Sequence, residues 1–280
     1  MNLYTVDAGQ FKLDGGAMFG VVPKKIWNTI NPADAQNLCT WDMRCLLIEK
    51  EGRLILIDTG LGKKQSPKFF SHYEPSDLDA LPKSLRNLGV DPDDITDVVL
   101  THLHFDHCGG AVEQNPLSGA LSPAFKNATY WTHSQHFNHA LHSNPREKAS
   151  FLSENIVPLQ EHEQLRFVDK SSPIIAGLRF ITVNGHTEKM ILPVMEYKQR
   201  TLVYCADLIP SVGHLPVNFV MSYDIRPLES MKEKHAFLTE AVQNQYVLCF
   251  EHDPIHEACT VKLNERGKFV ADETFRLSSI

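Results

Sequence analysis

The sequence lacks the features that would place it in a membrane or outside the cell. No stretch approaches the ~20 uncharged apolar residues that a transmembrane helix needs. The opening segment, residues 1–16, carries acidic residues early and has no basic region followed by an apolar run, so it does not resemble a signal peptide. We therefore expect a soluble, cytoplasmic protein with no membrane partner.

Paired cysteines and basic clusters are missing as well. The six cysteines include no CxxC pair and no closely spaced framework, which indicates reduced, mostly buried thiols. The net charge is −7 and no block of Lys or Arg occurs, so we expect no nucleic-acid partner. The chain has 280 residues, 42% of them hydrophobic and 22% charged, which is typical of a globular protein. A chain of this length can form one domain, and we predict a single domain over 1–280.

Apolar runs in both halves of the chain predict strands, and helical patterns follow them. The predicted strands are Cys45–Glu49, Arg53–Asp58, Asp97–Thr101, Thr129–Thr132, Arg179–Val183, Ile191–Tyr197, Leu202–Ala206 and Tyr246–Phe250. The predicted helices are Asp77–Leu88 with Ser76 as N-cap, a helical region from His133 toward Asn155, and Leu228–Asn244. Two strand-rich halves, each followed by helices, indicate two packed sheets with helices outside.

The most informative segment is HLHFDH, residues 102–107, directly after a predicted strand. In an extended chain, residues two apart point the same way, so His102, His104 and Asp106 can share one face. His107 follows at once, and two glycines allow a sharp turn into a helix. Four potential ligands in one loop favour a metal site over a histidine-rich polar loop. Imidazole and carboxylate suit zinc, iron or manganese better than a metal that prefers thiolate.

This segment resembles the HxHxDH signature of the metallo-β-lactamase superfamily, and other motifs follow in the order of that family. They are Asp58 in DTG, His186 after a strand, Asp207 at the end of LVYCAD and His252 in FEHDP. The resemblance covers nearly the whole chain. It implies an α/β fold, the αβ/βα four-layer sandwich of two mixed sheets with outer helices.

The resemblance also implies a binuclear metal centre. The ions would be two divalent metals, zinc first, with manganese, iron or cobalt as alternatives. By position, His102, His104 and His186 would bind one ion, Asp106, His107 and His252 the other, and Asp207 would bridge them. Asp106 would also count as catalytic, and a metal-bridging hydroxide would be the nucleophile. Among the competing histidines, His252 is preferred to His256 because it directly follows a predicted strand.

Several further residues have two interpretations each. Asp58 either orients a ligand imidazole or caps a turn, and the resemblance favours orientation. The segment 15–20 is expected to be a flexible glycine-rich loop, and its Met18 and Phe19, with Trp27, either line an apolar acyl pocket or pack in the core. His214 either contacts substrate or caps a loop.

The sequence departs from the lactonases of this superfamily in two places, at Pro210 and after Thr187, where Glu188 and Lys189 break their common GHTPGH pattern. Pro210 occupies the position where those enzymes often carry a tyrosine, so Tyr223 is a candidate replacement phenol and catalytic residue.

A histidine recurs at every third residue of one predicted helix, at His133, His136, His139 and His142. Residues at this spacing drift around the helix, which favours a solvated face or an oligomer contact over a second metal site.

Among the branches of the family, the resemblance is to the lactonase and organophosphate-hydrolase-like group. It implies hydrolysis of a small-molecule ester, such as a lactone or a related ester or phosphotriester. Two alternatives stay open, a glyoxalase II-like thioesterase and a non-catalytic metal-binding module. A homodimer is possible.

Overall fold

The computed structural model describes residues 1–171 and 173–280. The chain divides into two compact units, one of Met1–Gly9 with Met43–Ala176 and the other of Gln10–Asp42 with Gly177–Ile280. Two mixed six-stranded sheets are present, as predicted, together with a small two-stranded sheet. The boundary between the units falls within the first two strands. The single domain over 1–280 therefore stays a prediction.

The first sheet has the strand order β1-β2-β3-β4-β7-β8. Its strands are β1 (Asn2–Asp14), β2 (Leu38–Lys50), β3 (Arg53–Ile57), β4 (Asp97–Val99), β7 (Thr129–Thr132) and β8 (Leu165–Phe167). From β3 to β8 each strand is parallel to its neighbour, so the carboxyl ends of these four strands share one edge. Every residue of β4 is buried, as in parallel strands that are covered on both faces.

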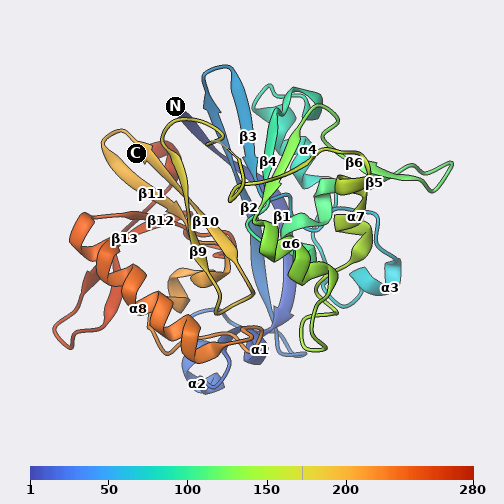
Figure 1. The fold of residues 1–280 in the computed structure, drawn as a ribbon. Coiled ribbons are helices and arrows are strands. Elements are labelled where there is room, and N and C mark those ends of the chain that lie inside the picture. Colours follow the sequence, from blue (N-terminus) through green and yellow to red (C-terminus); the bar gives the residue numbers. More distant parts are fainter. Residues whose placement is uncertain (172) are drawn as a thin grey trace. The chain divides into compact units, whose positions relative to one another are not determined.

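Short helices accompany this sheet in the first unit. They are α3 (Pro67–Phe70), α4 (Ala80–Asn87), α5 (Phe105–Cys108), α6 (Ser134–Leu141) and α7 (Ser153–Glu161). The α7 helix packs against α5 and against the hairpin of β5 (Val112–Gln114) and β6 (Leu121–Pro123). In Figure 1 the turn of this hairpin extends away from the rest of the unit. This packing holds α7 beside the helix that contains part of the HLHFDH segment.

The second sheet has the order β14-β13-β12-β11-β10-β9. Its strands are β9 (Leu178–Val183), β10 (Met190–Tyr197), β11 (Arg200–Tyr204), β12 (Val247–Cys249), β13 (Ala258–Leu263) and β14 (Phe269–Phe275). Because β10 is antiparallel to both β9 and β11, and β11 is parallel to β12, strands β9, β11 and β12 run the same way. Their carboxyl ends therefore meet at one edge. Helix α8 (Pro227–Asn244) packs on β13 in the same unit (Figure 1).

The predicted strands all occur; β2 begins at Leu38 rather than Cys45, and every other end differs by at most two residues. Three local predictions were wrong. Ser76 is not an N-cap, because the helix begins at Ala80 and Asp79 precedes it. The helical region from His133 toward Asn155 is two helices, α6 and α7, with an irregular segment between them. Residues Gly15–Phe19 form the short helix α1 rather than a flexible loop.

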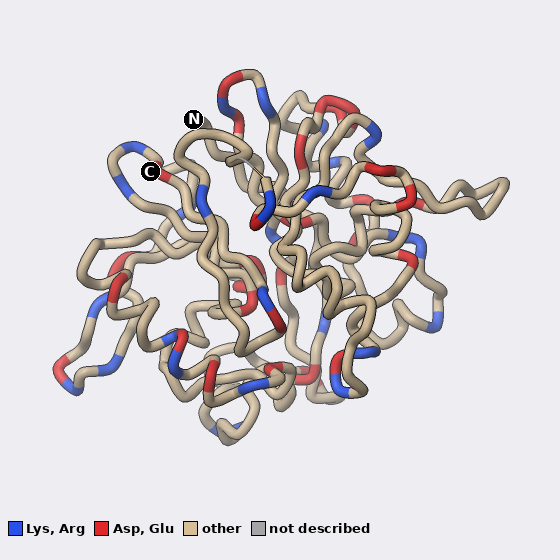
Figure 2. The backbone as a smooth tube through the Cα atoms, viewed as in Figure 1, with Lys and Arg blue, Asp and Glu red and all other residues tan. Residues whose placement is uncertain are grey.

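The cysteines, the helix lengths and the distribution of charge bear on the predictions made from composition. All six cysteines are free and buried, as predicted. No helix of the described residues is both long and apolar enough to cross a bilayer. In the view of Figure 2, Lys and Arg positions are interspersed with Asp and Glu positions within each unit.

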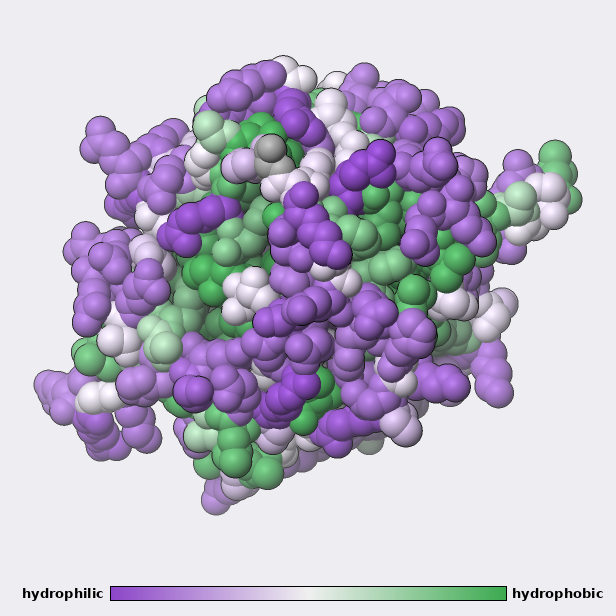
Figure 3. Space-filling model, viewed as in Figure 1, coloured by the Kyte–Doolittle hydropathy of each residue, from purple (hydrophilic) through white to green (hydrophobic). Residues whose placement is uncertain are grey.

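Exposed apolar side chains bear on the possible homodimer. Leu117, in the turn between β5 and β6, is 97% exposed, and Figure 3 shows hydrophobic atoms at the end of that projecting hairpin. A single exposed leucine is not a contiguous apolar patch, so by itself it does not indicate an interface. The homodimer itself stays a prediction.

Candidate metal centre

The first unit brings together the four potential ligands of the HLHFDH segment. All four are buried, with exposed fractions of 8% or less. The ring centroids of His102 and His104 are 4.6 Å apart and those of His102 and His107 are 3.9 Å apart. His107 Nε2 lies 3.7 Å from Asp106 Oδ2. The cluster therefore fits one part of a metal site.

The local backbone explains why these side chains meet. His102 and His104 lie in an extended stretch after β4, which gives them the same side, as the alternation predicted. Asp106 and His107 instead belong to the first turn of α5. A Cβ atom at Gly110 would lie 2.3 Å from the carbonyl oxygen of Thr59, so only glycine allows this close approach of the two loops.

Asp58 lies after β3, at the same sheet edge, and its carboxylate organises the cluster. Oδ1 accepts the backbone N–H of Thr101 at 2.8 Å, and Oδ2 accepts the Thr101 hydroxyl at 2.7 Å. Oδ2 also lies 3.2 Å from Nδ1 of His107. Because a carboxylate only accepts, His107 carries its proton on Nδ1 and has its lone pair on Nε2. These contacts fit the proposed orientation of a ligand imidazole.

The tautomer of His102 is set through the same network. The Thr101 hydroxyl donates to Asp58, so toward His102 Nδ1, 3.1 Å away, its oxygen acts as the acceptor. The proton of His102 is therefore on Nδ1, and Nε2 carries the lone pair that a metal needs. Sequence analysis had not singled out Thr101, although it directly precedes the motif.

The second unit brings the other three predicted ligands together. His186, Asp207 and His252 follow β9, β11 and β12, whose carboxyl ends share one edge, and all three are buried. Asp207 Oδ2 lies 3.1 Å from Nε2 of His186, and Asp207 Oδ1 lies 3.2 Å from Nε2 of His252. Each oxygen of one carboxylate thus faces a different imidazole.

Both imidazoles of this unit are held at their other nitrogen. His186 Nδ1 lies 3.0 Å from a carboxylate oxygen of Asp224, and His252 Nδ1 donates to the carbonyl oxygen of Asp42 at 2.7 Å. In both rings the lone pair that a metal ligand needs is therefore on Nε2. Neither partner is recognisable from the sequence, because Asp224 and Asp42 are far along the chain from the histidines whose Nδ1 they hold.

A glycine and a glutamate fix the loop that carries His186. The Glu233 carboxylate, on α8, accepts the backbone N–H groups of Asn184 at 2.7 Å and Gly185 at 2.9 Å. A Cβ atom at Gly185 would lie 2.4 Å from the backbone nitrogen of Ser230. Glycine is therefore required for the loop to pack on the start of α8.

His214, a candidate substrate contact, is buried in the core of its unit. His214 is 1% exposed, and its ring stacks on Phe19 with centroids 4.6 Å apart. Its Nε2 lies 2.9 Å from the Met18 carbonyl oxygen and its Nδ1 2.7 Å from the Ser211 hydroxyl. Burial lowers the pKa of His214 to about 3, so the ring is neutral: Nε2 donates and Nδ1 accepts. These contacts favour the loop-holding interpretation.

The residues predicted to line an apolar acyl pocket are buried as well. Met18, Phe19 and Trp27 are 2% exposed or less, and Phe19 stacks on Trp27 at 5.6 Å between centroids. This favours core packing over a pocket wall. Tyr223 is 36% exposed, in the loop before α8, so its side chain can reach solvent.

A different aromatic cluster lies beside the metal-binding segment. The rings of Phe69, Tyr73 and Phe105 pack together, with centroids 4.7 to 5.2 Å apart. Burial raises the pKa of Tyr73, and the negative charge of Asp106 raises it further. Sequence analysis did not identify this cluster, although Phe105 lies within the motif.

The recurring histidines agree with the expected solvated face only in part, since His142 is exposed but His136 is not. His136 is completely buried, and its Nε2 accepts the backbone N–H of Leu103 at 2.8 Å. His139 is partly buried and lies 2.7 Å from the buried carboxylate of Glu147. The helix α6 follows β7, whose carboxyl end shares the edge with β3 and β4, and His136 contacts the HLHFDH segment directly.

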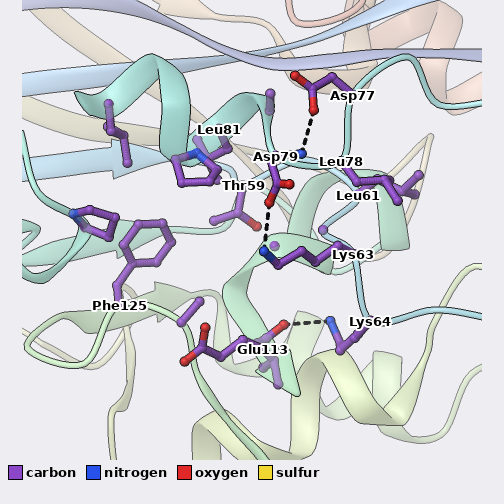
Figure 4. Close-up of a pocket in the computed structure, with 18 of the residues that line it drawn as sticks. Thr59, Leu61, Lys63, Lys64, Asp77, Leu78, Asp79, Leu81, Glu113 and Phe125 are labelled. Carbon is purple, nitrogen blue, oxygen red and sulfur yellow. Dashed lines mark hydrogen bonds and ion pairs between the residues drawn. The ribbon is translucent and has the colours of Figure 1, made fainter. Parts of the chain in front are cut away.

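A pocket of about 710 Å³ lies in the first unit, and Thr59 and Gly110 are among the residues that line it (Figure 4). Its lining is largely apolar, with Leu61, Leu81 and Phe125, and an ion pair of Lys63 with Asp79 lies at its side. None of the seven predicted ligands is among the described residues that line it. It is therefore distinct from the ligand clusters.

Residues 44–265 match the model of the metallo-beta-lactamase superfamily. The chain belongs to this superfamily. It is 24% identical over 195 residues to the N-acyl homoserine lactonase AiiA of Bacillus thuringiensis subsp. kurstaki, a match that covers 66% of this chain and 66% of that protein. The chain thus spans slightly less than two thirds of the length of this relative.

Two solved structures are similar over almost the whole chain. A probable metal-dependent hydrolase from Staphylococcus aureus is 27% identical, with a TM-score of 0.86 and coverage of 98% of both chains. The dizinc quorum-quenching lactonase AidC is 20% identical, with a TM-score of 0.79 and coverage of 98% of this chain and 95% of that one. The predicted metallo-β-lactamase fold is confirmed.

Proposed function

We propose that the seven ligands of the two units together hold two divalent metal ions and that the chain hydrolyses a small lactone. The observation that carries the proposal is the Asp207 carboxylate, whose two oxygens face His186 and His252 separately. Such a carboxylate can bind one ion with each oxygen and so reduce the repulsion between them. Histidine and carboxylate donors suit zinc, and manganese, iron or cobalt are alternatives.

Ions held by these residues would make water available as a nucleophile near neutral pH, because a bound divalent metal lowers the pKa of water to about 7. The chain itself prepares the ligands. Asp58, Thr101 and Asp224 hold ligand imidazoles at Nδ1, so the metal-binding nitrogen has its lone pair ready at neutral pH. Little reorganisation is then needed when metal binds.

The substrate class follows from two considerations. Two of the similar proteins, AiiA and AidC, are lactonases by name. The aromatic cluster of Phe69, Tyr73 and Phe105, next to Asp106, offers an apolar surface for an acyl chain. The proposed partner is therefore a small molecule with an ester-type ring and an apolar group. Tyr223 stays a proposed contact for that substrate, and His214 and the Met18–Phe19–Trp27 group are proposed to shape its surroundings from within the core.

A panel of substrates tests the proposal. Zinc-loaded protein is given an N-acyl homoserine lactone, a glutathione thioester, an aryl ester and a phosphotriester, with metal-stripped protein as control. We expect lactone opening to have the highest kcat/KM and to vanish without metal. Preferred release of thiol would instead indicate a glyoxalase II-like thioesterase, and no turnover of any substrate would indicate a metal-binding module.

A further inference from the structure

Glu147 is a buried carboxylate between two histidines of the first unit. It lies in the irregular segment between α6 and α7, and only 2% of the residue is exposed. Its Oε2 lies 2.7 Å from Nε2 of His139 and accepts the side-chain N–H of Asn144 at 2.6 Å. Its Oε1 lies 3.7 Å from Nε2 of His104, one of the predicted ligands.

The surrounding segment is fastened to the metal-binding loop at several points. The Phe105 backbone N–H donates to the Ser150 carbonyl oxygen at 3.0 Å. The Phe151 ring packs against His104, with centroids 4.7 Å apart, and against His136 at 5.8 Å. Glu147 therefore belongs to a packed layer behind the HLHFDH segment rather than to a loop that happens to pass nearby.

A buried carboxylate is costly unless hydrogen bonds or a positive charge compensate it. His139 and Asn144 donate to one oxygen. The other oxygen faces His104, and a distance of 3.7 Å is an ion-pair distance, longer than a hydrogen bond. A carboxylate in this place favours a proton on His104 Nε2, and this leaves the lone pair of that ring on Nδ1.

His104 thus differs from the other four predicted ligand histidines. His102, His107, His186 and His252 have their protein partner at Nδ1 and direct Nε2 to the cluster. At His104 the carboxylate stands at Nε2 instead. The HLHFDH segment therefore holds His102 and His107 with the proton on Nδ1 and His104 with the proton on Nε2. The charge of Glu147 selects the Nε2-protonated form of His104.

We propose that Glu147 is a positioning residue for the metal that His102 and His104 would bind. It acts by fixing the tautomer and ring orientation of His104, and His139 and Asn144 hold its carboxylate in place. This rests on the proposed function, because His104 needs a fixed tautomer only as a metal ligand. The proposal gives a role to the histidine repeat of α6, which the ligand set itself does not use.

The test compares Glu147→Gln with a matched control, Glu161→Gln, on the exposed end of α7. Both zinc affinities of the full-length protein are measured by competition with a chelator, and thermal unfolding of the metal-free forms checks folding. We expect Glu147→Gln to weaken one of the two affinities ~10–100-fold and to leave the other unchanged. Glu161→Gln should change neither. Cobalt-loaded protein should show altered absorption bands from one site only.

Unchanged zinc affinities and cobalt bands in folded Glu147→Gln would overturn the proposal. If that variant does not fold, His139→Gln decides in the same assay, with a smaller loss at the same site expected and no loss contradicting it. The proposed function fails separately: wild-type protein that binds two zinc ions but opens no lactone would refute the activity, while the affinity comparison would still test Glu147.

Discussion

At the scale of single residues, the candidate site depends on side chains that hold other side chains. Asp58 accepts from Thr101 and His107, Thr101 in turn accepts from His102, and Asp224 holds His186. Each contact fixes one nitrogen of an imidazole and so defines the other as a ligand. Metal binding then needs no change of tautomer, which is why loss of such a partner weakens a metal site even when every ligand is present.

Thr101→Val tests this network at nearly constant side-chain volume. The variant loses the donor to Asp58 and the acceptor for His102 inside a buried cluster. We expect the free energy of unfolding to fall by about 1–3 kcal/mol and zinc affinity to fall ~10–100-fold. Thr239→Val, on helix α8, is the control, and equal effects of the two substitutions on zinc affinity would argue against the network.

At the scale of elements, the helices and strands with a clear apolar pattern could be predicted from the sequence. The buried runs near Arg53 and Leu202 became β3 and β11. The sequence did not identify β1, whose residues Asn2–Asp14 mix apolar and polar side chains without a clean alternation. The short helix α1 was missed because its glycines favour a loop by propensity, whereas packing on Trp27 determines its conformation. Tertiary packing outweighs local preference in α1.

Gly185→Ala tests the contact between the His186 loop and helix α8. Its Cβ atom would meet the Ser230 backbone, so the loop or the helix must shift. We expect a loss of about 3 kcal/mol in the free energy of unfolding and weaker zinc binding, because His186 is the next residue. The matched change is Gly267→Ala, where nothing lies within 4 Å but φ is +67°. That variant should lose only about 1–2 kcal/mol and keep its zinc affinity; similar zinc losses in both would refute the contact's role.

Lys234 in α8 makes a prediction about pH. Burial lowers the pKa of this lysine to about 7, and its Nζ donates to the carbonyl oxygens of Pro216 and Phe219. In the unfolded chain the pKa is about 10.4. Between these values the unfolded state binds more protons than the folded state, so this group's contribution to stability rises with pH across that window and is flat below it.

Denaturant unfolding at pH 7, 8.5 and 10 measures this effect as a difference between wild type and Lys234→Met. We expect the free energy of unfolding of wild type, relative to that of Lys234→Met, to increase as pH rises from 7 to 10. The control is Lys232→Met, whose lysine is largely exposed and should give a difference that does not depend on pH. A difference at position 234 that is also independent of pH would contradict the lowered pKa.

At the scale of the whole molecule, the motifs could predict which residues form the site but not what surrounds them. HLHFDH, Asp207 and His252 follow strand ends, and a strand end is recognisable from sequence. Glu147 and Asp224 lie in irregular segments far along the chain from the ligands they contact, and Phe69 and Tyr73 are equally distant in the chain from Phe105, which their rings contact. Only the tertiary structure brings such residues to the ligands, so periodicity carries no sign of them.

Removal of metal should affect the stability of the whole chain. The proposed ions would take ligands from both compact units, and a ligand that binds only the folded state stabilises it. We expect a chelator to lower the Tm of the purified protein and added zinc to restore it. An unchanged Tm in protein shown to have lost its metal would speak against ligation by both units.

The most direct test of the central claim is the number of metal equivalents bound per chain, determined by elemental analysis of protein purified without chelator. The account predicts two equivalents for wild type and one for folded His107→Ala, which should also lose most lactone hydrolysis. One equivalent in wild type, or near wild-type turnover in His107→Ala with one metal gone, would contradict it.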